Sequence, residues 1–97
     1  MEKSISVAIF EDNHMLRDGY FQLINGMPGF TCVSAFDNAD DLLFKIRSCK
    51  PEVVLMDIDM PGISGIDAVL IIKENFPGIH IIMQTVFEDD DKIFRAI

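Results

Sequence analysis

Apolar residues along this chain follow two alternating patterns. Short continuous apolar runs alternate with stretches in which apolar side chains recur three or four residues apart, as at Leu16, Tyr20 and Leu23. The second spacing is typical of one face of an α-helix, and short apolar runs are typical of strands buried in a sheet. The pattern therefore predicts four strands, each followed by a helix. The predicted strands lie at 5–10, 30–36, 53–56 and 79–84.

Polar residues mark where the predicted helices begin. Asp37 or Asn38 can cap the second helix, and Ser64 followed by Asp67 resembles a capping box for the third. The acids at 88–91 stand where a fourth helix is expected, because negative side chains are favoured at a helix N-terminus. That last helical pattern runs to the end of the chain without a glycine or proline. We therefore expect an incomplete domain that stops inside an element.

The alternation of strands and helices predicts an α/β fold. Chains of this kind form a doubly wound parallel sheet with helices on both faces and right-handed crossovers. The predicted strands are almost entirely apolar, as expected when both faces of a sheet are covered. If the first and third strands are neighbours, the strand order is 2-1-3-4. A sheet of that order has a crevice at the carboxyl ends of its central strands.

Composition narrows the class of protein. The chain has 97 residues, enough for one domain, and 49% hydrophobic residues, enough for a packed core. Its formal net charge of -8, from 16 acids against 8 bases, argues against direct nucleic-acid binding and favours a cation or a basic partner. Cys32 and Cys49 lack metal-site spacing and are expected to be free thiols. Without a signal sequence or a long apolar stretch, we expect a cytoplasmic protein that does not contact the membrane.

Polar residues also stand at the predicted carboxyl ends of three strands. Glu11 and Asp12 follow the first strand, Asp57 follows the third, and Thr85 follows the fourth. Ligand sites in open parallel sheets lie beyond these ends, so the residues are candidates for one site. Each residue alone is more often part of a solvated turn or a helix cap. Their coincidence at matching strand ends favours a site.

Three carboxylates in one crevice indicate a divalent cation. They repel one another and raise one another's pKa values, and a hard cation such as Mg²⁺ offsets that repulsion. A carboxylate beside Mg²⁺ can also accept a phosphoryl group, since the transfer depends on in-line placement and neutralised oxygens more than on a strong nucleophile. We therefore expect a Mg²⁺ site at these acids, with Asp57 as a candidate phosphoryl acceptor.

The acids and the loop after Asp57 resemble a known family. Glu11-Asp12, the segment 57–65 with its pattern D-x-x-M-P-x-x-x-G, and Thr85 are similar in order and spacing to the receiver domain of two-component response regulators. The resemblance covers the whole chain. It implies a flavodoxin-like fold and a phosphorylation switch rather than an enzyme, with a histidine kinase or another phosphotransfer partner as the donor.

The resemblance also implies a role for each site residue. Asp57 would be the phospho-acceptor. Asp12 would bind Mg²⁺ directly, Glu11 would hold its water ligands or bind it in part, and the backbone carbonyl of Asp59 would be a further ligand. The hydroxyl of Thr85 would contact the phosphoryl group and carry the signal into the fourth strand and the helix after it.

The residues after the first strand carry a weaker resemblance. Asp12-Asn13-His14 with Arg17 and Gly19 is similar to receivers that precede a helix-turn-helix output domain. This similarity implies control of transcription, in which DNA is contacted only through an output domain outside this chain.

Two parts of the family pattern are missing from these residues. Receivers carry a lysine at the end of a fifth strand, where it pairs with the phosphate, and a fifth helix; none of the lysines here ends an apolar strand. We therefore expect weak or absent phosphorylation of Asp57 in this chain, with Mg²⁺ binding retained. The fourth strand should also be an open edge, which predicts a homodimer through that strand and the helix after it, or by strand exchange.

Two other functions fit part of the pattern. Asp57-Ile58-Asp59 matches the D-x-D motif of haloacid-dehalogenase-type phosphatases, in which the first aspartate is the nucleophile and the second a general acid. That family places the motif after its first strand, whereas here an acidic pair precedes it. The missing lysine leaves a third alternative, an assembly fragment without phosphoryl chemistry.

Overall fold

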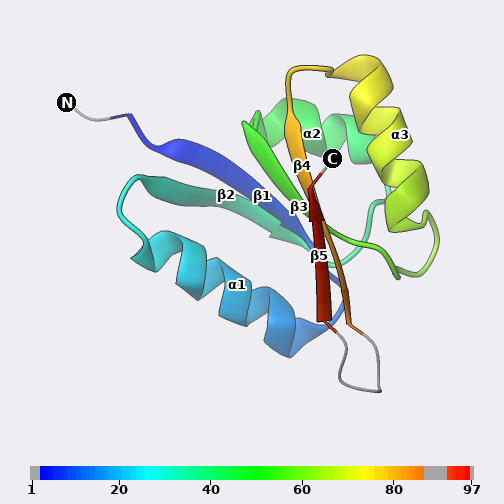
Figure 1. The fold of residues 1–97 in the computed structure, drawn as a ribbon. Helices are drawn as coiled ribbons and strands as arrows, with labels where there is room; N and C mark the ends of the chain where they lie inside the picture. Colours follow the sequence, from blue (N-terminus) through cyan, green and yellow to red (C-terminus); the bar gives the residue numbers. More distant parts are fainter. Residues whose placement is uncertain (1–2, 87–91, 97) are drawn as a thin grey trace.

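Four parallel strands and three helices form the body of the molecule, with a fifth, antiparallel strand at one edge. The computed structural model describes residues 3–86 and 92–96. The sheet has the order β2-β1-β3-β4-β5 (Figure 1), so the predicted order of the first four strands is confirmed. The elements are β1 (Ile5–Phe10), α1 (His14–Gly26), β2 (Phe30–Phe36), α2 (Leu42–Cys49), β3 (Val53–Asp57), α3 (Gly65–Asn75), β4 (His80–Val86) and β5 (Lys92–Ala96).

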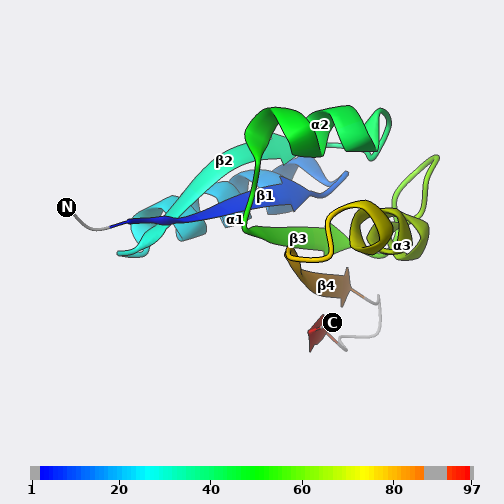
Figure 2. The same cartoon turned by 90° about the horizontal axis from the view of Figure 1, so that it is seen from above.

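Helices cover both faces of the sheet, as predicted. Figures 1 and 2 show α1 on one side, with α2 and α3 together on the other. Side chains alternate along β1: Val7 and Ile9 pack with α1, and Ala8 and Phe10 pack with α2 and α3. All four are at most 5% exposed, which explains why the strand sequence is continuously apolar. Within the described residues, no helix has the length and apolar character that a membrane span requires.

The register of the sheet brings distant residues to one edge. Phe10 of β1 is paired with Met56 of β3, so the residues that follow them, Glu11 and Asp57, are neighbours. Asp57 is in turn paired with Gln84 of β4. Neighbouring strands lie about 4.8 Å apart, and parallel strands end at the same edge of a sheet. The adjacency assumed from the sequence is therefore present.

One predicted helix cap is confirmed and another is wrong. Ser64 precedes α3, and its Oγ accepts a hydrogen bond from the Asp67 N–H at 3.2 Å. The helix α2 begins at Leu42, later than a cap at Asp37 or Asn38 would require. The Asn38 Oδ1 instead accepts from the Asp40 N–H at 2.8 Å, forming a local turn. Such side-chain turns compete with helix formation, which explains the later start.

The segment after β4 differs from its prediction. Lys92–Ala96 is a strand, antiparallel to β4, rather than the continuation of a helix; 88–91 lie outside the described residues. Pairing with β5 satisfies backbone groups that β4 would otherwise leave open at its edge, which favours the strand. The expected open edge at β4 is therefore also wrong, because β2 and β5 are the outer strands.

Candidate functional site

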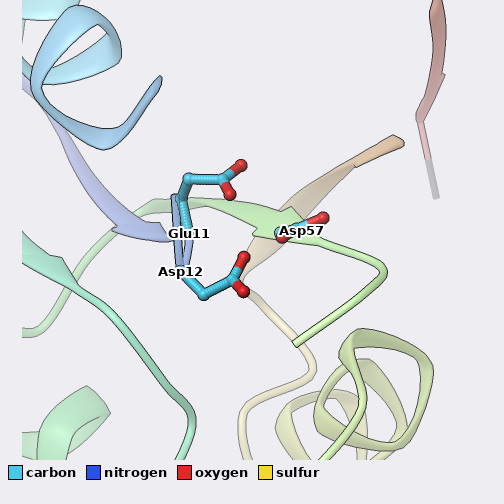
Figure 3. Close-up of side chains that lie close together, drawn as sticks. All are labelled: Glu11, Asp12 and Asp57. Carbon is cyan, nitrogen blue, oxygen red and sulfur yellow. The ribbon is translucent and has the colours of Figure 1, made fainter. Parts of the chain in front are cut away.

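Three carboxylates converge at the carboxyl edge of the sheet. Glu11 and Asp12 directly follow β1, and Asp57 is the last residue of β3. One carboxylate oxygen from each lies within 4.8 Å of the other two. Figure 3 shows the three side chains gathered at the ends of their strands. The structure thus joins the acids that the sequence placed at two separate strand ends.

The three acids differ in exposure. Glu11 is 3% exposed and Asp57 is 9% exposed, whereas Asp12 is open to solvent. Removing a carboxylate from water is unfavourable unless it finds donors or a cation. Two buried acids therefore lie behind one exposed acid, and a cation that enters from solvent can contact all three.

Neutral groups donate the hydrogen bonds that the buried carboxylates receive within the described residues. The Glu11 Oε2 accepts from the Asn13 N–H at 3.0 Å, and its Oε1 accepts from the Gln84 Nε2 at 3.4 Å. The Asp57 Oδ1 accepts from the Asp59 N–H at 3.2 Å. These donors orient the carboxyl groups without bringing a positive charge to them.

The hydrogen bonds of the Arg17 guanidinium go to groups other than these carboxylates. Arg17 Nη1 donates to the backbone carbonyl of Glu11 at 3.0 Å, so its hydrogen bond goes to the main chain rather than to the carboxylate. His14, which follows the acids in sequence, pairs with Asp18 through Nε2 at 3.3 Å. Both side chains are turned to the start of α1, outside the cluster of three acids.

Burial and crowding shift the pKa values of the inner acids upward. Burial raises the pKa of Asp57 from 3.8 to about 8, and the neighbouring Glu11 carboxylate adds to the rise. Burial also raises the pKa of Glu11, with a smaller upward contribution from Asp12. A divalent cation that prefers oxygen ligands would offset both effects. The three carboxylates therefore suit Mg²⁺ as ligands.

The backbone of Asp57 is held from the side of α3. Gly65 N donates to the carbonyl of Ile58 at 3.0 Å. A Cβ atom at Gly65 would overlap the carbonyl oxygen of Asp57 and lie 2.8 Å from the Ile58 Cα. Only glycine permits this approach, so α3 begins directly against the end of β3 and fixes the direction in which the loop leaves Asp57.

Other predicted site residues lie around the cluster. The side chain of Asp59 is exposed, and its backbone contacts Asp57. Thr85 follows Gln84 at the same edge, and its backbone pairs with Ile93 of β5; its side chain lies outside the described part of the structure. Since β5 is antiparallel, its first residue, Lys92, is paired with Val86 at this edge.

Gln84 is a site residue that the sequence analysis missed. It is 2% exposed and donates to Glu11. The signal was present as a polar residue near the end of an apolar strand. Strand ends often carry polar residues, however, and the sequence alone does not show that this one is buried beside two acids.

Known proteins similar to this chain share one family description. The family model described as Response regulator receiver domain matches residues 7–97. Response regulator GacA of Pseudomonas viridiflava is 35% identical over 86 residues, covering 89% of this chain and 40% of that protein. The uncharacterized transcriptional regulatory protein YxjL of Bacillus subtilis is 31% identical over 93 residues, covering 96% of this chain and 43% of that protein. The chain thus spans less than half the length of these relatives.

Solved structures show the same arrangement of strands and helices. A DNA-binding response regulator of the LuxR family from Staphylococcus aureus matches with a TM-score of 0.78 at 34% identity, covering 87% of this chain and 70% of that chain. The response regulator domain of Thermotoga maritima CheB matches with a TM-score of 0.79 at 28% identity, covering 86% and 61%. These matches confirm the predicted flavodoxin-like fold.

Replacing Gly65 tests the close approach of α3 to β3. Gly65→Ala should lower the free energy of unfolding by about 2 kcal/mol or more, because the methyl group meets backbone atoms that cannot rotate away. Gly19→Ala is the matched control, since Gly19 lies within α1 with open space around it. It should raise the free energy of unfolding by roughly 0.5 to 1 kcal/mol. Equal effects in urea denaturation would contradict the close approach.

The raised pKa values predict how stability depends on pH without metal. Between about pH 4 and pH 8 the folded state binds more protons at Asp57 than the unfolded state does, so the free energy of unfolding should fall as pH rises through this window. Asp57→Asn should flatten the slope and raise the melting temperature at pH 8. The exposed-site variant Asp37→Asn should keep the slope. A metal-free wild type whose melting temperature rises between these pH values would refute the assignment.

Proposed function

This chain belongs to the response regulator receiver domain family, and on that premise we propose that it is a phosphorylation switch in which Asp57 accepts a phosphoryl group in a Mg²⁺-dependent reaction. The observation that carries the proposal is the convergence of Glu11, Asp12 and Asp57, with ligand oxygens within 4.8 Å of one another. Oxygen ligands in this number and spacing would suit Mg²⁺, which phosphoryl transfer to a carboxylate requires.

The proposed reaction uses Asp57 as the nucleophile. A carboxylate oxygen attacks phosphorus, the bond from phosphorus to the donor atom breaks, and the donor leaves with its electron pair, so that an acyl phosphate remains. Asp12, Asp57 and the carbonyl of Asp59 would hold Mg²⁺, with Glu11 binding it through water or in part. When bound, Mg²⁺ neutralises charge on the transferred oxygens.

The electrostatics of the site explain why the reaction should need the ion. With a pKa of about 8, the Asp57 carboxyl is mostly protonated at neutral pH and is a poor nucleophile. A cation held by Asp12 favours the ionised form of Asp57. Asp12 and Asp57, by holding the ion together, would thus keep the acceptor carboxylate ionised for attack.

Signalling beyond Asp57 forms the second part of the proposal. The hydroxyl of Thr85 would contact the phosphoryl group, and the change would spread along β4 and the segment after it. The donor would be a histidine kinase or a phosphotransfer protein in the cytoplasm. DNA would be reached only through an output domain, as the family resemblance implies. Self-association stays a prediction, and the outer strand at that end of the sheet is β5 rather than β4.

The alternatives have less support. The family match and the acids from β1 do not favour a haloacid-dehalogenase-type phosphatase, and the Asp59 side chain, its expected general acid, is exposed. We propose a switch that is phosphorylated once rather than an enzyme that turns over substrate. An assembly fragment without phosphoryl chemistry does not account for three converging carboxylates.

Mg²⁺ binding is the first test of the site. Wild type should bind Mg²⁺, and Asp12→Asn should weaken binding by about tenfold or more, since a charged ligand becomes neutral. Isothermal titration calorimetry measures both. Asp37→Asn, at an exposed aspartate outside the cluster, should bind as wild type does. Equal affinities for the two variants would exclude Asp12 as a ligand.

Phosphorylation is the second test. Acetyl phosphate and Mg²⁺ should add one phosphoryl group in low yield, because among the described side chains no lysine or arginine reaches the Asp57 carboxylate to pair with the phosphate. Intact mass spectrometry should show this group released by hydroxylamine, as an acyl phosphate requires. Asp57→Asn should acquire none. Labelling that persists in Asp57→Asn, or that needs no Mg²⁺, would contradict the proposal.

A further inference from the structure

Gln84 is a buried polar residue near the end of β4. Its backbone pairs with Asp57 of β3, and only 2% of its surface is exposed. Side chains alternate along a strand, and Ile81 and Met83 pack in the core under α2 and α3. Gln84 therefore points to the opposite face, where it lines a groove beside α1 together with Ile82.

The side chain of Gln84 reaches past β3 to β1. Its Nε2 donates to the Glu11 Oε1 at 3.4 Å, which joins residues 73 positions apart. The other carboxylate oxygen, Oε2, accepts from the Asn13 N–H at 3.0 Å. Each oxygen of Glu11 thus receives one hydrogen bond from a neutral donor. Two donors at opposite ends of a carboxylate restrict its rotation, here beside Asp12 and Asp57.

The other end of the Gln84 carboxamide, the buried Oε1, has no hydrogen-bond partner in the described part of the chain. Gln84 also lines a groove of about 290 Å³, whose apolar walls include Leu23, Leu55 and Ile82. A buried amide oxygen without a partner lowers stability relative to an apolar side chain of similar size. Among the described contacts, the hydrogen bond to Glu11 is what a glutamine supplies at this position and an apolar side chain would not.

We propose that Gln84 is a positioning residue that holds the Glu11 carboxylate in the orientation needed for the Mg²⁺ site. The inference rests on the proposed function, since it concerns how the same three acids receive the ion. It adds a contact from β4, the strand that also carries Thr85, to a site otherwise built from β1 and β3.

A neutral donor suits this position better than the alternatives. An ammonium or guanidinium group would compete with Mg²⁺ for the carboxylate. An apolar side chain would leave one oxygen of a buried acid without a donor. A carboxamide orients the acid and leaves its charge available to the metal, which is how groups behind metal ligands usually act.

The test compares two glutamine substitutions. Gln84→Met keeps the length of the side chain, removes the donor and also removes the unpaired oxygen. Gln22→Met is the matched control, because Gln22 is exposed on α1. Mg²⁺ binding is measured by calorimetry and by the fluorescence of Tyr20, the single tyrosine in a chain without tryptophan. Tyr20 lines the same groove as Gln84.

The expected result separates positioning from structural support. Gln84→Met should bind Mg²⁺ about tenfold more weakly, as loss of a group behind a metal ligand does. Its melting temperature without Mg²⁺ should stay close to that of wild type, because Gln84→Met removes both the donor to Glu11 and an amide oxygen that lacks a partner among the described residues, and these two losses act in opposite directions. Saturating Mg²⁺ should restore its phosphoryl incorporation. Unchanged Mg²⁺ affinity, or weaker binding accompanied by a lower melting temperature, would overturn the inference.

A second measurement uses wild type alone. The side-chain amide signals of Gln84 in a ¹⁵N NMR spectrum should shift as Mg²⁺ binds, while those of Gln22 stay in place. Static Gln84 signals in a protein that binds Mg²⁺ would overturn the inference and leave the proposed function intact. A wild type that does not bind Mg²⁺ would remove the proposed function, and the inference with it.

Discussion

Repulsion between carboxylates buried at one sheet edge is the constraint on which the site depends. The apolar strands β1 and β3 must be neighbours to bury their side chains between two layers of helices, and this packing places Glu11 beside Asp57. The free energy gained by packing the core thus offsets the unfavourable free energy of bringing the carboxylates together. A bound cation would remove the penalty, so metal binding, protonation and stability would be coupled at the same place.

The surroundings of the acids hold them together despite this repulsion. Gly65 lets α3 begin against the backbone of Asp57, and Gln84 reaches Glu11 from β4. Both arrangements carry a local disadvantage: the first admits no side chain at position 65, and the second leaves a buried amide oxygen without a partner among the described residues. Functional sites often retain such unfavourable local features because the rest of the fold compensates for them.

Local sequence patterns predict the secondary structure correctly at β1 and wrongly at 92–96. The continuous apolar run of β1 predicts a strand correctly, because both faces of this central strand are buried. At 92–96 the residues fit a helix or a strand, and the open edge of β4 favours the strand. The helix α2 likewise begins later than predicted, because Asn38 forms a local turn with Asp40.

The sequence by itself determined the four strands and the acids that end two of them, since apolar periodicity and strand-end polarity are local signals. The strand order 2-1-3-4 followed only once the first and third strands were assumed to be neighbours, and the structure confirms it. Only the tertiary structure decided which groups surround those acids. The burial of Gln84, the contact of Gly65 with Asp57 and the raised pKa of Asp57 depend on strand register and helix placement. Strand register and helix placement result from packing between segments far apart in the chain, so a local sequence pattern cannot predict them.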